Sequence, residues 1–562
     1  MNDPTARSGA QIVLDVLLEE GVDLVFGYPG GAIMPLYDAL VGSRVRHVLV
    51  RHEQAAAFAA GGFARSSGRV GVCVATSGPG ATNLVTGIVD AYMDSVPIVA
   101  LTGQVRTPLM GTDAFQEADI ASITHAVTKR NICVRSVDEL ERTLRNAFRL
   151  ARGPRPGPVL VDLPTDVLKA TTIARTPCPA YPTLIDTPDP AGIGEALALL
   201  RAAERPVAIV GGGARISGAV EAFRRFCDLL ELPHTATINA LGCARPGDQR
   251  FLGMLGMHGW KAANLAVCGA DLVIALGMRF DDRVTGRVDR FATRAKVIHA
   301  DVDSAEFGKV VHADVALRGD LRETLSALVR ALETSEPRPA FGAWARTARE
   351  MGTALPRDRT PDGTLSATDV IDAYVALAPS GAVVATDVGQ HQMWAAQRVR
   401  PVDPRDFLTS AGLGAMGFGV PAAIGAQFAR PTAAVVAIVG DGGFQMSFGE
   451  LATIARFALP VKILLIDNRR LGMVRQWQEL FYEQRYSATD LSDNPDFVMI
   501  ARAYGIGAET VDHARDLEDA FARLFADRAP RLLHCACYPH ENVWPLIPPG
   551  AATSEAMEAV SA

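Results

Sequence analysis

The sequence predicts an α/β protein built from three doubly wound parallel-sheet domains. Short runs of apolar and β-branched residues alternate with segments of helical periodicity, which is typical of parallel sheets covered by helices on both faces. Two segments interrupt this alternation: residues 170–190 are rich in Thr and Pro, and residues 334–366 are rich in Pro, Arg and Gly. Such segments are typical of linkers. We therefore expect domains at residues 1–170, 190–335 and 365–545.

Composition narrows the class of protein. A chain of 562 residues is too long for a single hydrophobic core. The net charge of −7 argues against a nucleic-acid surface, and no apolar run approaches the length of about 20 residues that a membrane span needs. The first residues lack an apolar signal core and an Arg/Ser-rich transit segment, and the eight cysteines show no metal-ligand spacing. We expect a cytoplasmic protein with no nucleic-acid or membrane partner.

In the first part of the chain, two predicted strands lead into candidate site residues. The run 47–50 precedes Arg51-His52-Glu53-Gln54 and an Ala/Gly-rich helix that continues through Ala64. An acidic residue at the start of a helix is typical of a charge that complements the helix dipole, which is the simpler interpretation of Glu53. A further predicted strand, 69–75, ends in TSGPGATN, which by itself is an ordinary turn.

The middle part repeats the pattern of a strand followed by glycine. A predicted strand at 206–210 precedes Gly211-Gly212-Gly213, and another at 272–276 ends at Gly277. Arg279, just after the second strand, has the bidentate geometry that suits a phosphate or carboxylate. The run RFDDR at 279–283 is equally compatible with a surface cluster of ion pairs.

The third part contains the most informative motif. The apolar run 433–439 leads into Gly440-Asp441-Gly442, a helical segment follows at 450–457, and a second buried strand at 461–466 ends at Asp467-Asn468. Ligands of open parallel sheets lie beyond the carboxyl ends of the strands, so we expect Asp441 and Asn468 to lie side by side there. Their oxygens suit Mg²⁺ that holds a diphosphate. The alternative is two loop turns capped by Asp and Asn.

The segments GDGGFQMSFGEL and IDNRRLGMVRQWQ resemble the cofactor-binding motif of thiamine diphosphate enzymes. Within that group the chain is most similar to the acetohydroxyacid synthase (acetolactate synthase) family, from GVDLVFGYPGGAIMPLYDAL to ENVWPLIPPG. The resemblance implies the pyruvate oxidase/decarboxylase-like fold. It implies decarboxylation of pyruvate and transfer of the hydroxyethyl unit to a second pyruvate or to 2-ketobutyrate. The products, 2-acetolactate or 2-aceto-2-hydroxybutyrate, are precursors of branched-chain amino acids.

The resemblance also implies the cofactor contacts. Glu53 would contact the aminopyrimidine ring of thiamine diphosphate and promote loss of the proton from its thiazolium carbon. The Mg²⁺ ligands would be Asp441, Asn468 and the backbone carbonyl of Arg470, although the family often has Asn where this chain has Asp467. The residues expected to contact thiamine diphosphate are Tyr28, Pro29, Gly30, Glu53, Thr76, Pro79, Asn83, Val388, Gly389, Gln390, His391, Gly414, Met416, Gly440, Gly442, Gly443, Gly472 and Met473.

The middle part resembles the FAD-binding part of the same family, in which the flavin has no redox role in the synthase reaction. Arg283 is expected to bind the carboxylate of the second keto acid as well. The residues expected to contact FAD are Arg155, Gly211, Gly212, Gly213, Thr237, Leu255, Gly256, Met257, His258, Gly277, Arg279, Asp281, Arg283, Asp301, Gly319 and Asp320.

Further residues acquire catalytic or substrate roles from the resemblance. Phe115 and Gln116 would face the reaction centre, and Lys129 would lie near the entrance, although Lys129 could equally belong to a solvated face. Met416 would wedge the two cofactor rings into a bent form, or it could simply fill the core. Trp477 would select the second substrate; the alternative is that it only packs a cover segment.

The family binds its cofactor between two chains, so the resemblance implies a homodimer in which Glu53 and Asp441 of one active site come from different protomers. A small regulatory subunit is a possible further partner. Residues 481–497 and the tail around 544–550 are expected to form a mobile cover. Two other functions stay open. One is an FAD-dependent pyruvate oxidase, and the segments RFDDRVTG and RQWQ argue against it. The other is a non-catalytic paralogue that binds the cofactors, and the presence of Glu53, Asp441 and Asn468 argues against it.

Overall fold

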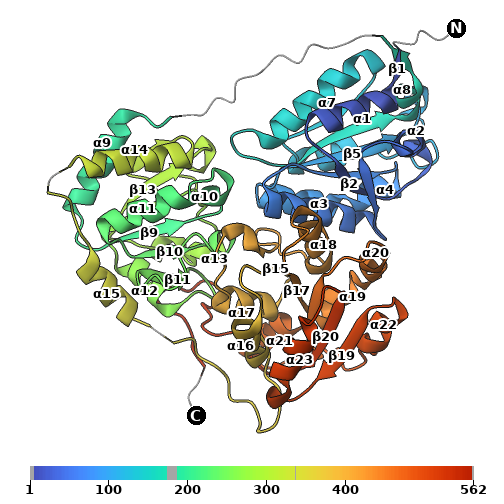
Figure 1. Ribbon diagram of the computed structural model, residues 1–562. Coiled ribbons are helices and arrows are strands. Elements are labelled where there is room, and N and C mark those ends of the chain that lie inside the picture. Colours follow the sequence, from blue (N-terminus) through green and yellow to red (C-terminus); the bar gives the residue numbers. More distant parts are fainter. Residues whose placement is uncertain (1–5, 174–186, 336, 353, 560–562) are drawn as a thin grey trace.

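The computed structural model describes residues 6–173, 187–335, 337–352 and 354–559. Within these residues the chain forms three six-stranded sheets, one in each part of the chain, and helices cover both faces of each sheet (Figure 1). Every strand pairing inside the three sheets is parallel. This confirms the predicted α/β fold with three parallel sheets.

The amino-terminal sheet has the strand order β3-β2-β4-β5-β7-β6. Its strands are β2 (Leu24–Gly27), β3 (Arg46–Leu49), β4 (Gly71–Ala75), β5 (Ile98–Gln104), β6 (Arg130–Cys133) and β7 (Val159–Pro164). Its helices are α1 (Gly9–Glu19), α2 (Met34–Leu40), α3 (Glu53–Ser67), α4 (Pro79–Asn83), α5 (Val85–Met93), α6 (Ile120–Thr124), α7 (Val137–Arg152) and α8 (Thr165–Lys169). The strands β1 (Arg7–Ser8) and β8 (Thr171–Thr172) form a separate antiparallel pair.

The middle sheet has the order β11-β10-β9-β12-β13-β14. Its strands are β9 (Pro206–Val210), β10 (His234–Ala236), β11 (Phe251–Met254), β12 (Leu272–Leu276), β13 (Lys296–Asp301) and β14 (Val315–Arg318). Its helices are α9 (Pro190–Ala202), α10 (Gly213–Ile216), α11 (Val220–Leu230), α12 (Lys261–Gly269), α13 (Asp282–Thr285), α14 (Leu321–Glu333) and α15 (Gly342–Glu350).

The carboxy-terminal sheet has the order β16-β15-β17-β18-β20-β19. Its strands are β15 (Val383–Thr386), β16 (Phe407–Leu408), β17 (Val435–Gly440), β18 (Lys462–Asp467), β19 (Gly507–Val511) and β20 (Arg531–Ala536). Its helices are α16 (Ala367–Leu377), α17 (Gln390–Arg398), α18 (Gly419–Ala429), α19 (Asp441–Gln445), α20 (Leu451–Arg456), α21 (Gly472–Phe481), α22 (Phe497–Ala503) and α23 (Leu517–Leu524).

The predicted strands agree closely with the observed ones. The strands expected at 206–210 and 272–276 are β9 and β12 without any shift, while β17 and β18 each end one residue later than expected. The strand expected from residue 69 begins at Gly71, because its pairing with β5 starts there, opposite Ile98. Continuous burial on both faces makes such runs recognisable from sequence.

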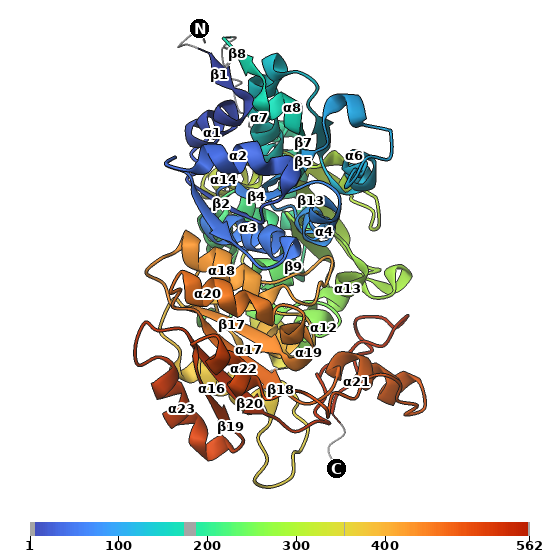
Figure 2. The same ribbon diagram turned by 90° about the vertical axis from the view of Figure 1, so that its right-hand side faces the viewer.

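Helices α3 and α18 join the amino- and carboxy-terminal domains and lie side by side in both ribbon views (Figures 1 and 2). Their backbones approach so closely that a Cβ atom at Gly62 would lie 2.3 Å from the carbonyl oxygen of Ala422. A Cβ atom at Gly425 would lie 1.9 Å from the carbonyl oxygen of Ala59. The Ala/Gly-rich composition of α3 therefore serves helix packing between domains, and one hydrophobic core continues through both of them.

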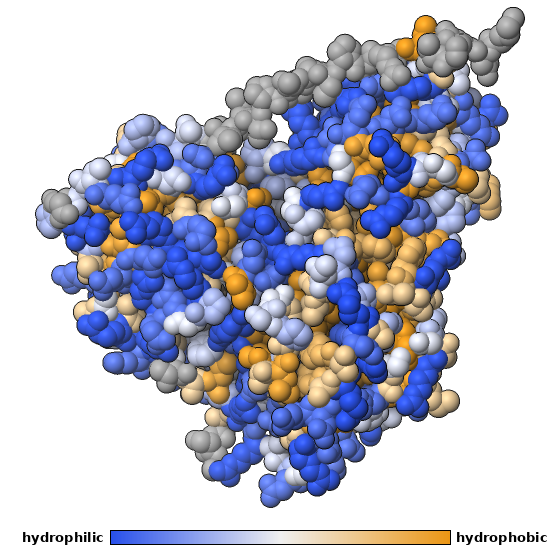
Figure 3. Space-filling view, in the orientation of Figure 1, coloured by the Kyte–Doolittle hydropathy of each residue, from blue (hydrophilic) through white to orange (hydrophobic). Residues whose placement is uncertain are grey.

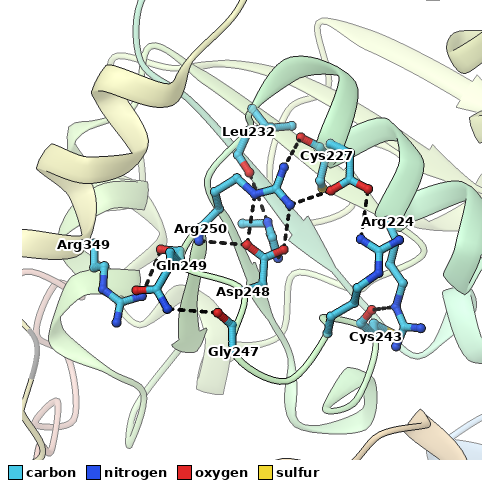
Figure 4. A network of polar contacts seen from close by, with 12 residues as sticks. Arg224, Cys227, Leu232, Cys243, Gly247, Asp248, Gln249, Arg250 and Arg349 are labelled. Atoms are coloured by element: carbon cyan, nitrogen blue, oxygen red, sulfur yellow. Dashed lines mark hydrogen bonds and ion pairs between the residues drawn. The ribbon is translucent and has the colours of Figure 1, made fainter.

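The structure describes only part of the first predicted linker and most of the second. Residues 174–186 of the first lie outside the described residues. The second contains α15, so the expectation of an irregular linker is wrong for residues 342–350. Trp344 donates a 3.1 Å hydrogen bond to the carbonyl oxygen of Pro206. Arg349 donates a hydrogen bond of 3.1 Å to the carbonyl oxygen of Gln249, and Figure 4 shows this contact. Tertiary contacts of this kind stabilise a short helix inside a segment whose Pro and Gly content predicted a linker.

The carboxy-terminal tail is packed against the body of the protein, contrary to the expected mobile cover. Val543, Trp544, Leu546 and Ile547 are buried. The Trp544 indole donates a 2.7 Å hydrogen bond to Asp358.

Hydrophilic residues cover most of the face seen in Figure 3, and apolar residues gather around α18 and α20. Among the described residues, no helix combines the length and apolarity required to cross a membrane.

Candidate active site

The carboxyl ends of β17 and β18 bring acidic and amide side chains together. Asp441 begins α19 directly after β17, and Asp467 and Asn468 stand at the end of β18; all three are buried. Asn494 bridges the two strand ends, because its side-chain amide donates to Asp441 (2.9 Å) and to Asp467 (3.0 Å). Burial, followed by the neighbouring Asp467 carboxylate, raises the pKa of Asp441. A divalent cation would relieve this repulsion between two carboxylates.

The side chain of Arg470 is directed away from these acids. Its guanidinium pairs with Asp490, while its backbone amide donates to the side-chain oxygen of Asn468 at 3.2 Å. The Asn468 amide in turn donates to Gln390 at 3.2 Å. The Arg470 side chain therefore lies away from the acids, while its backbone lies beside Asn468.

Glycines at the end of β17, in α19 and at the start of α21 leave room for the side chains of Gln390, His391 and Met416. A Cβ atom at Gly440 would lie 2.8 Å from the His391 ring, one at Gly442 would lie 3.3 Å from the terminal methyl of Met416, and one at Gly472 would lie 2.0 Å from Gln390. The Nε2 atom of His391 is buried and has no hydrogen-bond partner among the described residues. Burial lowers the pKa of His391 to about 3, which leaves the ring neutral.

Asp387 holds two of the predicted cofactor loops together. Its buried carboxylate accepts hydrogen bonds from the backbone amides of Val388 (2.8 Å), Gly417 (3.0 Å) and Gly419 (2.9 Å). The first amide lies in the loop of Val388 and Gly389, and the other two follow Met416. The sequence analysis assigned no role to Asp387, although its position directly after β15, at the carboxyl edge of the sheet, is typical of a site residue.

In the amino-terminal domain, three adjacent strands end at a second group of predicted residues. Glu53 begins α3 after β3, and its carboxylate accepts a 2.9 Å hydrogen bond from the Asn83 amide at the end of α4. Thr76, after β4, accepts a 3.3 Å hydrogen bond from the amide of Ala32 in the loop that follows β2. A Cβ atom at Gly30 would lie 2.5 Å from Thr76. The predicted Glu53, Asn83, Thr76 and Gly30 thus share one edge of the sheet.

A cavity of about 1510 Å³ lies where the three domains meet. It brings together most of the predicted flavin residues and the predicted Val388, Gly389, Gly414, Met416, Met473 and Trp477. The flavin residues that line it are Arg155, Gly212, Gly213, Thr237, Leu255, Met257, His258, Gly277, Arg279, Asp281, Arg283, Asp301 and Asp320.

Several predicted site residues lie outside this lining. Glu53, Asp441 and Asn468 are among them. Phe115 is 87% exposed on the surface of the amino-terminal domain, and the neighbouring Gln116 has a left-handed backbone with a φ of 59°. Lys129 donates a 2.6 Å hydrogen bond to the carbonyl oxygen of Arg155. Within one chain these residues do not converge on the cavity.

The acidic residues of the middle domain have structural partners of their own. Asp281 caps the start of α13 and Asp320 caps the start of α14, each through hydrogen bonds from two backbone amides. Arg155 forms ion pairs with Asp303 and Glu306, both at 2.7 Å. These contacts fix the side chains at the cavity wall, so capping and ligand binding are compatible roles.

The tail of the chain holds the cavity loop of Met257 and His258. The carbonyl oxygen of Pro545 lies 3.1 Å from Nδ1 of His258, and the amide of Ile547 donates to the carbonyl oxygen of Met257 at 2.9 Å. Gln397 donates to the carbonyl oxygens of His258 (2.8 Å) and Trp544 (2.9 Å). No local sequence signal predicted this link between the tail and the middle domain.

Comparison with known proteins identifies the three domains. Residues 7–123 match the model of the thiamine pyrophosphate enzyme amino-terminal TPP-binding domain, residues 193–328 match that of the central domain, and residues 387–535 match that of the carboxy-terminal TPP-binding domain.

Named relatives match nearly the whole chain. It is 48% identical to the acetolactate synthase isozyme 2 large subunit of Escherichia coli K12, covering 99% of this chain and 100% of the relative. It is 46% identical to the acetolactate synthase large subunit of Parasynechococcus marenigrum, with coverage of 99% and 91%. It is 44% identical to a probable acetolactate synthase large subunit of Methanocaldococcus jannaschii, with coverage of 98% and 95%. The chain belongs to the acetolactate synthase large subunits, a family of thiamine diphosphate-dependent enzymes.

Proposed function

We propose that this protein catalyses the first shared reaction of branched-chain amino acid biosynthesis. It would decarboxylate pyruvate and join the remaining two-carbon unit to a second pyruvate or to 2-ketobutyrate, giving 2-acetolactate or 2-aceto-2-hydroxybutyrate. The observation that carries this proposal is the single cavity in which the predicted flavin residues meet Met416, Met473 and Trp477. A pocket at a domain junction with a few convergent polar groups is the expected form of such a site.

Thiamine diphosphate fits the residues present. The unpartnered buried Nε2 of His391 suits a diphosphate oxygen, and the glycines at 440 and 472 let the His391 ring and Gln390 lie close to the backbone beside it. When bound, this cofactor supplies the nucleophilic carbon that attacks a 2-keto acid and allows CO₂ to leave. Glu53, oriented by the Asn83 amide, would hold the proton that an aminopyrimidine ring exchanges. Met416 would press the two rings of the cofactor toward each other.

Mg²⁺ would be held by Asp441, Asn468 and the backbone carbonyl of Arg470. These oxygen donors match the preference of Mg²⁺. The buried Asp441 carboxyl has a raised pKa beside Asp467, and a bound cation would offset the repulsion between the two carboxylates. The ion would neutralise a diphosphate at the carboxyl edge of the sheet.

FAD would occupy the middle-domain part of the cavity. The volume of about 1510 Å³ exceeds the roughly 300–1,000 Å³ of pockets for drug-sized ligands, as a dinucleotide requires. Arg279 and Arg283 line the cavity and offer guanidinium groups to phosphates or carboxylates. Gly213 lets two cavity loops pack closely, because a Cβ atom there would lie 2.8 Å from the Gly277 backbone. Arg283 also suits the carboxylate of the second keto acid, and Trp477 lines the same cavity.

We further propose a cytoplasmic homodimer. Phe115 is 87% exposed, and Tyr92, Leu109, Ile123 and Met446 are also exposed apolar side chains, which supports a covered surface in the assembly. Phe115, Gln116 and Lys129 would then contribute to the active site of the partner chain. Because the relatives are named large subunits, a small regulatory subunit is a further proposed partner.

The deciding experiment is an assay of acetolactate formation from pyruvate by the purified protein. We expect activity that requires thiamine diphosphate and Mg²⁺ and that needs bound FAD without net flavin reduction. Flavin reduction coupled to pyruvate turnover would indicate an oxidase instead. An absence of CO₂ release in the presence of all three cofactors would indicate a non-catalytic paralogue.

A further inference from the structure

The buried carboxylate of Glu450, in the carboxy-terminal domain, forms hydrogen bonds with the backbone segment that immediately precedes Glu53. Glu450 ends a short 3₁₀ helix, Phe448–Glu450, that follows α19. Its Oε1 atom accepts hydrogen bonds from the backbone amides of Arg51 (2.7 Å) and His52 (3.2 Å). These amides belong to a different domain and stand 399 and 398 residues away in the chain. Glu450 is only 2% exposed, so these bonds are shielded from water.

Thr453 of the same domain adds a further contact with this segment. The Thr453 hydroxyl lies 2.6 Å from Oε2 of Glu450 and 3.2 Å from the carbonyl oxygen of Leu49, at the end of β3. The Arg51 guanidinium folds back onto the carbonyl oxygens of Leu49 (3.0 Å) and Val50 (3.3 Å). The backbone from Leu49 to His52 is thereby held by Glu450 and Thr453 of the carboxy-terminal domain and by the side chain of its own Arg51.

This segment determines where the Glu53 carboxylate lies. Glu53 is the first residue of α3, directly after His52, so a shift of the preceding backbone moves its Cα and its side chain. The single Asn83 hydrogen bond orients the carboxylate but does not fix the start of the helix. A displacement of about 1 Å at a reacting group can cost about a hundredfold in rate.

We propose that Glu450 is a positioning residue for Glu53: it holds the start of α3 at the place where the Glu53 carboxylate can act on the aminopyrimidine ring of thiamine diphosphate. This rests on the proposed function of Glu53. Glu450 does not touch the cofactor or the substrate itself. In the proposed homodimer, the segment that begins with Asp441 would therefore serve two active sites: Asp441 would serve the diphosphate in one, and Glu450, through Glu53, the aminopyrimidine ring in the other.

The test compares Glu450→Ala with a matched structural control. Glu541 is also a buried carboxylate of this domain; it accepts from the amide of Ala367 (2.7 Å) and the hydroxyl of Thr368 (2.6 Å) and has no contact with residues 49–53. Glu541→Ala therefore removes a comparable set of hydrogen bonds elsewhere. The readouts are the thermal midpoint, the Kd for thiamine diphosphate with Mg²⁺, and the rate of hydrogen–deuterium exchange at the thiazolium C2 carbon of the bound cofactor, followed by quench and NMR.

We expect both alanine variants to lose stability, and only Glu450→Ala to slow the C2 exchange, by about tenfold or more. The Kd for thiamine diphosphate should change less than threefold, because Asp441 and Asn468 are untouched. Glu450→Gln should restore most of the exchange rate, since its amide oxygen can accept from Arg51 and His52. If Glu450→Ala does not fold, Thr453→Val tests the contacts with the same segment by an isosteric change and should slow exchange to a smaller extent.

Unchanged C2 exchange in a folded Glu450→Ala or Thr453→Val variant would overturn the proposal, as would equal slowing in Glu541→Ala. A failure of the proposed function of the protein would give a different result. In that case the wild-type protein would show no Mg²⁺-dependent binding of thiamine diphosphate, or no accelerated exchange, before any substitution is made.

Discussion

The carboxylate of Asp94 accepts a 2.9 Å hydrogen bond from the backbone amide of Gly412, 318 residues further along the chain. The same carboxylate accepts from the amide of Ala411, from Asn239 of the middle domain and from Arg65 of its own domain, all at 3.0 Å. One buried side chain therefore joins all three domains. It lies beneath the loop that carries Gly414 and Met416 into the central cavity.

Asp94→Asn should destabilise the protein by about 3 kcal/mol or more, because the amide nitrogen of Asn cannot accept the bonds now made by buried donors and Arg65 loses part of its compensation. The measurement is the free energy of unfolding from denaturant titration. Glu333→Gln, which removes an exposed ion pair with Arg225, is the control and should cost less than about 1 kcal/mol. Similar values for the two variants would show that Asp94 does not support the domain junction.

Glu53→Gln should leave the fold intact and slow proton loss from bound thiamine diphosphate by about a hundredfold or more, because an acid–base partner of the aminopyrimidine ring is removed. Exchange of the thiazolium proton into D₂O measures this step directly. The exposed Glu139→Gln on α7 serves as the control and should behave as wild type. Normal turnover of Glu53→Gln at saturating cofactor would refute the assignment.

Asp441→Ala should abolish Mg²⁺-dependent retention of thiamine diphosphate, because a diphosphate beside an incomplete cation site is poorly neutralised. Calorimetric titration of the cofactor with and without Mg²⁺ is the measurement. Asp490→Ala is a useful comparison, since it removes only the partner of the Arg470 side chain and leaves the backbone carbonyl in place. Unchanged metal-dependent binding in Asp441→Ala would place the ion elsewhere.

The affinity for Mg²⁺ should fall as the pH is lowered from 8 to 6. Burial and the adjacent Asp467 raise the pKa of Asp441, so below that pKa the metal must displace a proton, and the Kd should rise by up to about tenfold per pH unit. A carboxyl group with a raised pKa in the folded state stabilises the metal-free fold at low pH. That contribution is lost as the pH rises through the raised pKa.

Asp467→Asn removes the neighbouring charge and should flatten the pH dependence of Mg²⁺ binding. Calorimetry at three pH values decides between the two behaviours. A Kd that does not change with pH in the unmodified protein would mean that Asp441 is already ionised in the absence of metal.

Trp477→Leu should keep acetolactate formation but lose most of the preference for 2-ketobutyrate over pyruvate. The two acceptors differ by one methylene, and contact with it in an apolar pocket is worth roughly 1–3 kcal/mol, or about 10–200-fold in selectivity. Trp477 lines the cavity and packs edge-on against Phe481 at 5.7 Å between ring centroids. A competition assay with both keto acids measures the product ratio.

Phe481→Leu removes the neighbouring ring and is the matched control for Trp477→Leu. If Trp477 only packs α21, both variants should lose stability and both products together, with an unchanged product ratio. That outcome would exclude Trp477 from the substrate pocket.

The sequence by itself determined the three parallel sheets and the family. Strands β9 and β12 were predictable to the residue because strands buried on both faces are continuous apolar runs bounded by glycine. The position of Asp441 and Asn468 after two neighbouring strands was predictable because the carboxyl ends of neighbouring parallel strands meet at one edge. Such patterns are local, so a single chain displays them without its tertiary structure.

Only the tertiary structure decided how the domains support the site. Distant segments are held together by the side chains of Asp94, Asp387, Asn494 and Glu450, which bond to their backbone amides or carboxylates. The carbonyl oxygen of Pro545, in the buried tail, contacts the His258 ring. Helix α15 escaped prediction because it is short and lies in a segment rich in Pro, Arg and Gly; in the folded chain its Trp344 bonds to Pro206 of the middle domain. A hydrogen bond between residues hundreds of positions apart depends on where two domains dock, and no spacing along the chain records that geometry.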